Sequence, residues 1–267
     1  MRRWRVHPGV VTAAAFGYAF LYLPIAVLVL YSFNASPRVA VWQGFSVRWY
    51  AALIHDPQLI GAALLSLKVA AIAATVATVI GLMAAIALVR FGRFRGRSLF
   101  AGLIGAPLVV PDVVLGLALL LFFVALADLV GWPAHRGFPT ITLAHATFGV
   151  AYATVVIRAR LMRFDPAIEE AARDLGASEW RVFRRVTLPL LLPALASAWL
   201  LAFTLSLDDL VVASFVSGPG ASTLPMVIFS KVRLGLSPEV NALASILMLF
   251  VVIAVAASFR LMRRQGE

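Results

Sequence analysis

A charged island between two apolar runs decides how this chain is understood. It reads Glu169-Glu-Ala-Ala-Arg-Asp-Leu-Gly-Ala-Ser-Glu-Trp-Arg-Val-Phe-Arg-Arg-Val-Thr-Leu-Pro189. Within it, Glu170-Ala-Ala172 is followed by Gly176 and then by Leu188-Pro189. The sequence on either side is strongly apolar, so the island is the place where soluble proteins can contact this chain.

Composition places the chain in a membrane. Of its 267 residues, 62% are apolar and 13% are charged, whereas soluble domains are about 45–50% apolar and about 25% charged. A helix that crosses a bilayer needs about 20 mostly apolar residues. Six segments meet that requirement: 11–33, 61–89, 99–127, 140–160, 189–216 and 240–262. The sequence therefore predicts an all-α polytopic membrane protein with six transmembrane helices in a single domain, residues 1–267.

The basic residues predict the orientation of these spans. Most of them lie in four pieces that fall on one side of the membrane: Arg2, Arg3, Arg5; Arg90, Arg93, Arg95, Arg97; Arg158, Arg160, Arg163, Arg173, Arg181, Arg184, Arg185; and Arg260, Arg263, Arg264. By the positive-inside rule that side is the cytoplasm, with both termini there. The net charge of +11 is then a topology signal. Nucleic-acid binding is the other interpretation, and these short membrane-flanking pieces disfavour it.

The N-terminal end is expected to be a retained span. Its start, Met1-Arg-Arg-Trp-Arg5, resembles a secretion signal, but the apolar run that follows exceeds the 7–15-residue core of such signals. No small-residue cleavage site follows it. The chain has no Cys, and its four His, at 7, 55, 135 and 145, lack ligand spacing, so we expect no metal site and no cofactor.

Two loops on the outer side are long, 34–60 and 217–238. The first carries Trp42-Gln-Gly-Phe and Trp49-Tyr50, aromatics typical of the membrane interface. The second begins with the turn-rich run from Ser217 to Pro225. The apolar stretch after it, from Met226 to Leu234, is too short to span, so a re-entrant or surface helix is expected there.

The island carries helix start and stop signals. Asp165-Pro166 is an N-cap followed by the residue that is best tolerated at the first helical position. Glu169-Glu170 then falls in the first turn, where the helix dipole favours anions. Gly176 ends this helix, and Ser178-Glu179 starts another. We expect two short helices joined at Gly176 and lying across the membrane surface.

Two interpretations of the island remain open from its residues. A basic amphipathic helix on anionic lipid suits Arg181, Arg184 and Arg185. Alternatively, the small side chains of Glu170-Ala-Ala172 and the following Gly176 permit close docking into a groove on another protein.

Acidic residues inside spans are the other unusual feature. A carboxylate there costs about 2.5–3.5 kcal/mol, so it usually faces a cavity, a partner or a pathway. Asp112 follows Pro107-Leu-Val-Val-Pro111, two prolines that break the third span, and it either caps the restarted helix or serves function. Asp208-Asp209 is a repelling pair near the outer end of the fifth span.

The acidic pair needs a cation nearby. Lys68, Lys231 or Arg233 is one source. The other is an organic dication in transit, which carboxylates and aromatic rings bind through ion pairs and cation–π contacts.

The island resembles the EAA loop of permease subunits of binding-protein-dependent (type I) ABC importers, with Val186 where the family has Ile. The resemblance implies the type I permease fold, with a cytoplasmic coupling-helix loop at about 161–188. It assigns coupling to the ATPase to Glu170, Ala171, Ala172, Gly176, Glu179, Leu188 and Pro189.

A second resemblance concerns the substrate. The run from Ser206 to Pro225, with Ser237-Pro-Glu-Val-Asn-Ala-Leu-Ala244, is similar to permeases of spermidine/putrescine importers, most of all the second permease of a putrescine system. It implies a bacterial inner-membrane protein. It also implies a substrate pathway that includes Trp49, Asp112, Ser206, Asp208 and Asp209.

The same resemblance implies the partners. Lys68 and Lys231 lack the preceding glycines of a phosphate-binding loop, so we expect no enzyme activity in this chain and a separate ABC ATPase dimer at the 161–188 loop. A companion permease, giving a heterodimer, and a periplasmic or extracellular polyamine-binding protein are implied as well. The lipid bilayer surrounds the spans, and no nucleic acid is expected.

Three alternatives stay open. One is a related type I permease for thiamine or ferric iron. Another is a stand-alone channel or secondary transporter, which should show inverted repeats or broken-helix pairs. A third is a membrane-embedded enzyme, for which His145 with Asp112 is the best pair on offer. Within the polyamine interpretation, putrescine and spermidine are both open.

Overall fold

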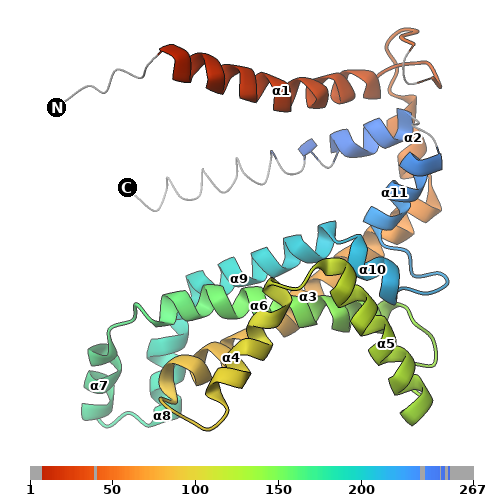
Figure 1. Ribbon diagram of the computed structural model, residues 1–267. Coiled ribbons are helices and arrows are strands. Elements are labelled where there is room, and N and C mark those ends of the chain that lie inside the picture. The colour runs from red at the N-terminus through yellow and green to blue at the C-terminus, as the bar shows by residue number, and fades with distance from the viewer. Residues whose placement is uncertain (1–7, 39–40, 235–237, 247, 250–251, 253–267) are drawn as a thin grey trace. The chain divides into compact units, whose positions relative to one another are not determined.

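The computed structural model describes residues 8–38, 41–234, 238–246, 248–249 and 252. The named helices are α1 Pro8–Ser32, α2 Arg48–Ile54, α3 Pro57–Arg90, α4 Arg97–Gly105, α5 Asp112–Val130, α6 Phe138–Leu161, α7 Pro166–Asp174, α8 Glu179–Val182, α9 Leu188–Asp208, α10 Val211–Val216 and α11 Leu224–Leu234 (Figure 1). A 3₁₀ turn, Ala106–Leu108, follows α4, and a π turn, Phe183–Thr187, joins α8 to α9. The predicted all-α class is confirmed.

Five helices of the described part are long and apolar enough to cross a membrane. They are Gly9–Ser32, Pro57–Arg90, Asp112–Val130, Phe138–Leu161 and Glu179–Asp208. The sixth predicted span, 240–262, lies largely outside the described residues. The short helix expected after Pro225 is present as α11, which has 11 residues.

The third predicted span, 99–127, is broken near Pro111, as its two prolines predicted. The structure divides it into α4 and α5, with the 3₁₀ turn and an irregular link between them (Figure 1). Pro111 causes the break, since its φ of −58° and ψ of 141° take the chain out of the helix, and a proline has no N–H to donate. The helix therefore restarts at Asp112.

The helix at the fifth predicted span, 189–216, has ends that differ from that range. On its N-terminal side the helix begins earlier, at Glu179, and continues through the π turn. On its C-terminal side it stops at Asp208, because Asp209 has an extended backbone with ψ of 122°. The side chain of Asp209 accepts the backbone N–H groups of Val212 and Ala213, and α10 starts from there.

Contacts divide the chain into two compact units. One comprises residues 61–227, and the other comprises 1–60 with 228–267. Each is described by itself below. The first unit contains the island and the acidic residues that the sequence singled out, and the second contains Trp49.

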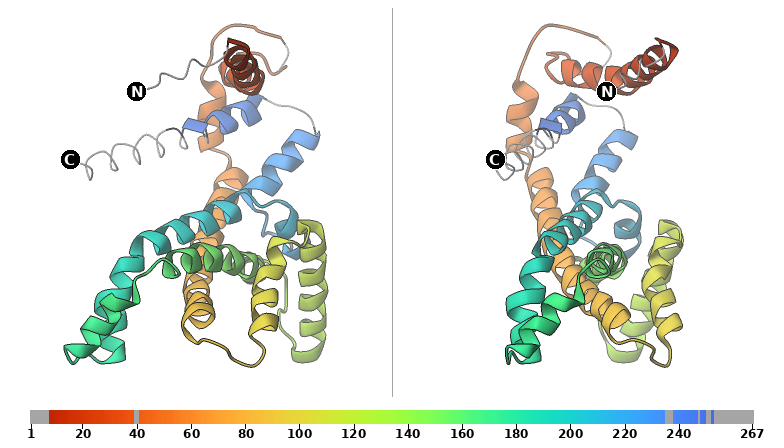
Figure 2. Two further views of the ribbon diagram at one scale, coloured as in Figure 1. Left: turned by 60° about the vertical axis from the view of Figure 1, so that its left-hand side comes forward. Right: turned by 90° about the vertical axis from the view of Figure 1, so that its left-hand side faces the viewer.

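Small residues hold the unit 61–227 together. In it, α6 packs against α9, as both views of Figure 2 show, and α5 packs against α10. A Cβ atom on Gly149 of α6 would lie 2.9 Å from the Cβ of Ala77 in α3 and 3.7 Å from that of Ala202 in α9. Small side chains let membrane helices approach this closely. In lipid the hydrophobic effect does not drive helices together, so van der Waals contact between closely packed helices stabilises them.

In the unit 1–60 with 228–267, one buried amide holds the segment after α1. Asn34, after α1, accepts the backbone N–H of Ser36 and of Gln43, and donates to the carbonyl of Val41. In the same unit Lys231 lies 2.8 Å from Asp56, the residue before α3. The described side chains of α1 are mostly exposed, as expected of a helix that faces lipid.

Candidate functional site

The charged loop, residues 161–188, begins with a helix whose ends match the sequence signals. Asp165 accepts the backbone N–H of Ala167 at 3.0 Å, and Pro166 follows at the first helical position. At the other end Gly176 has φ of +81°. The N–H of Gly176 donates to Arg173 and that of Ala177 to Ala172, the paired bonds of a Schellman cap. Both predicted ends of α7 are confirmed.

The second helix of the loop starts where predicted and continues much further. It begins at Glu179 after Ser178, but it is not a short surface helix. It runs through the π turn into α9, so Glu179 and Asp208 are the two ends of one spanning helix of 30 residues. The prediction of two short helices is therefore wrong for the second one. The helix continues through the apolar sequence after Leu188-Pro189, and Pro189, which has no N–H to donate, lies just after the π turn rather than ending the helix.

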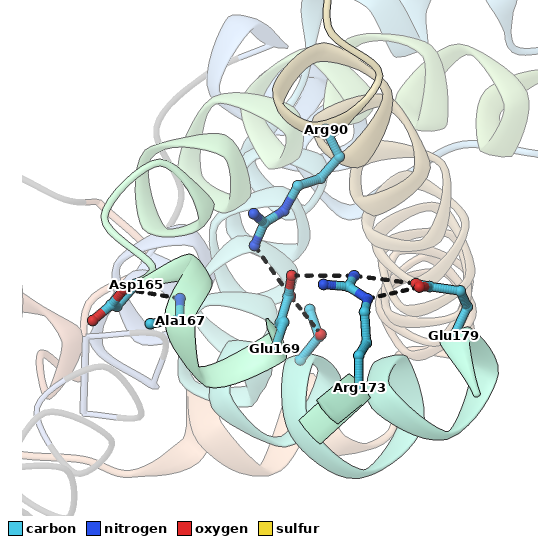
Figure 3. Close-up of polar contacts among 7 residues, drawn as sticks. Arg90, Asp165, Ala167, Glu169, Arg173 and Glu179 are labelled. Carbon is cyan, nitrogen blue, oxygen red and sulfur yellow. Dashed lines mark hydrogen bonds and ion pairs between the residues drawn. The ribbon is translucent and has the colours of Figure 1, made fainter. Parts of the chain in front are cut away.

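Arg173 and Glu179 bridge the turn at Gly176. The Nε of Arg173 lies 2.6 Å from Glu179 Oε1, and a second guanidinium nitrogen lies 3.1 Å from Oε2 (Figure 3). The hydrogen bond to Glu179 raises the pKa of Arg173 above its ordinary value. This bidentate pair connects α7 to α8 across the turn at Gly176.

Glu169 joins the loop to two spanning helices. Its carboxylate is buried and receives a guanidinium nitrogen of Arg90 at 3.1 Å (Figure 3). The hydroxyl of Thr187 donates to the same oxygen at 2.7 Å. Arg90 ends α3 and Thr187 ends the π turn before α9. Glu169 therefore ties α7 to both.

Sequence reasoning missed Glu169 as a functional candidate. It treated this residue only as an anion in the first turn of the helix. Two adjacent glutamates in an arginine-rich loop were a signal for such a residue. The sequence does not say which of the two is buried, or that its arginine partner lies 79 positions away.

The seven predicted coupling residues lie together in this loop and the first turn of α9. Glu170, Ala171 and Gly176 are exposed, Ala172 is half-buried, and Glu179 is exposed and paired with Arg173. Two large apolar side chains are also exposed beside them, Leu175 at 90% and Trp180 at 67%. A cavity of about 420 Å³ lies against Arg90, Glu169, Glu170 and Arg173.

A second cavity, about 280 Å³, gathers the acidic residues of the spans. We call it the acidic cavity; it is lined by Asp112, Asp208 and Asp209 together with Phe148, Tyr152 and Pro107. Asp112 lies at the start of α5, Asp208 at the end of α9, and the two rings on α6. Three of the five predicted pathway residues thus meet here, all within the unit 61–227.

The fourth pathway residue, Ser206, lies behind the cavity wall. It is buried, and its Oγ is 2.6 Å from Nδ1 of His145. The other ring nitrogen, Nε2, is 3.1 Å from Asp209 Oδ2. His145 was missed as a site residue, because a lone histidine in an apolar helix has no sequence signature.

Within the unit 61–227, the expected cation Lys68 does not pair with Asp208 or Asp209. Lys231, in the other unit, is 2.8 Å from Asp56 and 3.6 Å from Glu239. Neither Lys68 nor Arg233 forms an ion pair among the described residues. The residue that faces Asp209 is His145. The prediction considered only residues that carry a formal positive charge, and histidine is counted as neutral at pH 7.

Asp112 does not cap the helix that it starts. No side-chain hydrogen bond caps α5, so the capping interpretation is not supported. Its carboxylate is exposed and lines the acidic cavity.

The pairing of His145 with Asp112 that an enzyme would need does not form in the described part of the chain, since His145 contacts Ser206 and Asp209. Those three side-chain types also occur in serine hydrolases, but here Ser206 and His145 are buried and no substrate carbonyl can reach the hydroxyl. Across the described ranges no cluster of three His, Asp or Glu is arranged to hold a metal ion.

The fifth pathway residue, Trp49, lies in the other unit. Its indole N–H donates to the carbonyl of Asn34 at 2.8 Å, and the guanidinium of Arg48 lies 4.2 Å from the centre of its ring. Trp49 is half-buried and fixes α2 against the segment after α1.

Residues 77–265, which include the charged loop and the acidic cavity, match the family described as "binding-protein-dependent transport system inner membrane component". The chain belongs to this family. The identification that the island suggested is therefore confirmed. Membership of this family and the apolar helices together make the chain an inner-membrane transport component.

Its relatives are permeases rather than enzymes. The chain is 60% identical over 232 residues to the putrescine transport system permease protein PotI of Escherichia coli (strain K12), covering 87% of this chain and 83% of that protein. It is 45% identical over 250 residues to the spermidine/putrescine transport system permease protein PotC of Haemophilus influenzae, covering 94% and 95%.

The fold is that of ABC transporter subunits of known structure. A chain of a bacterial ABC transporter involved in the import of the acidic polysaccharide alginate aligns with a TM-score of 0.70 at 19% identity, over 94% of this chain and 95% of that one. At this identity the likeness concerns the fold alone, and the expected permease fold is confirmed.

Proposed function

We propose that this chain is the transmembrane permease subunit of an ATP-driven importer that moves putrescine, spermidine or both into the cytoplasm. The observation that carries the proposal is the 60% identity to a putrescine permease over most of both chains. Two chains this similar over most of their length share the packing of their spans.

The acidic cavity supports a cationic substrate. Asp112 and Asp208 present exposed carboxylates beside the rings of Phe148 and Tyr152. Ammonium groups form strong charge-assisted hydrogen bonds with carboxylates, and they are attracted to the faces of aromatic rings. A polyamine carries ammonium groups separated by methylene segments, so it matches a wall that alternates acidic and aromatic side chains.

The charged loop supports coupling to an ATPase. Glu170 and the small residues Ala171 and Gly176 are exposed, and Leu175 and Trp180 add apolar surface. An exposed apolar patch with a polar rim is typical of a docking site. In this proposal the ATPase dimer binds the loop at these residues and at Glu179.

One continuous helix carries the movement from the loop to the cavity. It runs from Glu179 to Asp208, 30 residues that span about 45 Å at 1.5 Å per residue. Glu179 lies at its loop end and Asp208 lines the acidic cavity at the other. When the ATPase moves the loop and tilts this helix, the carboxylate of Asp208 moves with it.

The remaining features of the proposal follow the family. Residues 1–267 act as a single permease domain with both termini and the charged loop in the cytoplasm. A companion permease completes the pore as a heterodimer, and a periplasmic or extracellular binding protein delivers the substrate. ATP binding opens the cavity outward, and hydrolysis resets the inward-facing state, which is alternating access.

Uptake in cells tests this function. Cells that lack their own polyamine importers would express this chain with the ATPase, companion permease and binding protein encoded beside it. We expect uptake of radiolabelled putrescine or spermidine that disappears when this chain is omitted. A fully assembled complex that takes up neither polyamine, but does take up thiamine or ferric iron, would contradict the proposed substrate. The assignment as an importer permease would still stand.

A further inference from the structure

The side chain of His145 is fully buried in the most buried spanning helix, α6, and touches three neighbours. Its Nδ1 is 2.6 Å from Ser206 Oγ, and its Nε2 is 3.1 Å from Asp209 Oδ2. Its ring centre is 5.3 Å from that of Phe148. Asp209 and Phe148 both line the acidic cavity, so His145 lies directly behind two parts of its wall.

The carboxylate oxygens of Asp209 are already engaged by the protein. Oδ1 accepts the backbone N–H of Val212 at 3.3 Å, and Oδ2 accepts that of Ala213 at 2.7 Å. Nε2 of His145 lies 3.1 Å from the same Oδ2 and has no hydrogen-bond partner of its own among the described residues, so the contact between them is one of proximity. The side chain of Asp209 is only 10% exposed.

Asp208 and Asp112 differ from Asp209 both in the exposure of their carboxylates and in the contacts that these carboxylates make. Both are exposed and line the same cavity, and neither has an ion-pair partner in the described part of the chain. Their oxygens are therefore open to a cation that enters the cavity.

We infer that His145 is a positioning residue that, with Ser206, holds Asp209 and Phe148 in the cavity wall, and that Asp208 and Asp112 are the carboxylates that bind the cationic substrate. The inference rests on the proposed function. The two adjacent aspartates then have different roles. The negative charge of Asp208 binds the substrate, whereas Asp209 forms part of the cavity wall. Ser206, whose Oγ reaches His145 rather than the cavity, then acts through His145.

The comparison of Asn with Ala at each position tests this division in the complete transporter. Asn at 209 can place its amide oxygen where Oδ2 lies, so that it still accepts the Ala213 N–H and faces Nε2 of His145, and it loses only the longer bond from Val212. We therefore expect Asp209→Asn to lose less than about threefold in uptake rate and Asp209→Ala to lose about tenfold or more. At 208 the charge itself is needed, so Asp208→Asn and Asp208→Ala should both lose about tenfold or more.

A double-mutant cycle checks that His145 acts through Asp209. The loss of uptake in the double variant His145→Ala, Asp209→Ala should be no greater than that of the worse single variant. In the double variant His145→Ala, Asp208→Asn, by contrast, the fold-losses of the two single variants should multiply. Membrane levels and co-purification of the companion subunits are measured for each variant. Equal losses in Asp209→Asn and Asp208→Asn, at equal amounts of complex, would overturn the inference.

A second measurement is independent of the substrate. The chain has no cysteine, so single-cysteine variants report access to the cavity without interference from this subunit. In the assembled complex, a cationic methanethiosulfonate should modify Asp208→Cys at least about tenfold faster than Ser206→Cys, because only exposed thiols react readily. Equal rates would overturn the inference. If the wild-type complex transports neither polyamine, the proposed function fails while this result still decides the placement of the two residues.

Discussion

The guanidinium of Arg90, the last residue of α3, lies 3.1 Å from the carboxylate of Glu169 in α7, although 79 positions separate them in sequence (Figure 3). Thr187, next to α9, donates to the same carboxylate oxygen at 2.7 Å. The loop is therefore fastened to the ends of two long apolar helices through one buried side chain. We expect a force applied at the loop to reach both helices together.

Removal of Glu169 should uncouple ATP hydrolysis from transport. Loss of one partner of a buried ion pair costs about 3–5 kcal/mol, and somewhat less is expected here because Arg90 is about one quarter exposed. We expect Glu169→Ala to lower uptake about tenfold or more while ATPase activity of the purified complex persists. Glu169→Gln, which keeps an acceptor for Thr187 and Arg90, should retain more uptake than Glu169→Ala. Equal uptake in Glu169→Ala and the wild type would contradict this role.

Gly176 should tolerate no charged side chain. Its φ of +81° is costly for other residues, by about 1–2 kcal/mol, although Asn and Asp adopt it more readily than most. We expect Gly176→Asp to abolish uptake while the chain still inserts into the membrane, because a new negative charge lies on the surface proposed for the ATPase. Gly176→Asn, matched in shape and backbone preference, is the control and should retain partial uptake. Normal uptake in Gly176→Asp would refute the docking site.

Gly149 should be essential for packing. A Cβ there would lie 2.9 Å from Ala77, so a leucine would force α3 and α6 apart. Overpacking of this kind typically costs about 1–3 kcal/mol. We expect Gly149→Leu to lower the amount and thermal stability of the purified complex. Gly102→Ala in α4, where nothing lies within 4 Å of the new atom, serves as control and should change neither. A stable Gly149→Leu complex would show that the helices pack otherwise.

The Asp56–Lys231 pair should stabilise its unit with a defined pH dependence. The hydrogen bond from Lys231 lowers the pKa of Asp56 below its ordinary value of 3.8. A lowered native pKa means that the stabilisation is complete above that ordinary value and is lost as the pH falls below it. We expect the stability difference between wild type and Asp56→Asn, about 1 kcal/mol or less for such a partly exposed pair, to stay constant from about pH 8 to 5 and to shrink below about pH 4.

Thermal unfolding of the complex across this range measures the difference between the two chains. Lys231→Gln should reproduce the loss, and the double variant should add little to it. A difference that changes between pH 8 and 5 would mean that another group is responsible.

Local signals in the sequence predicted local structure well. The N-cap at Asp165, the turn at Gly176 and the break near Pro111 were all found, because each depends on one residue's own backbone preference or hydrogen bond. The same reasoning failed on helix continuity. Nothing local separates a short surface helix after Ser178 from one that continues through a π turn into α9.

Long-range contacts could not be predicted from one sequence. Glu169 meets Arg90, and His145 meets Asp209, only in the folded chain, where α3, α6 and α9 pack closely through small residues. The acidic pair was expected to need a cation, either a lysine or arginine or an organic dication in transit. Within its unit, Asp209 instead accepts two backbone N–H groups, with the imidazole of His145 3.1 Å away, and none of these groups is apparent from formal charge.

Reconstituted transport tests the central claim most directly. The complete complex would be placed in proteoliposomes with ATP on the side of the ATPase, and with putrescine-loaded binding protein on the other side. We predict accumulation of putrescine against its gradient, with ATP hydrolysis that rises when the loaded binding protein is added. Equilibration of putrescine without ATP would contradict the account, since it would mean that the chain forms a passive channel.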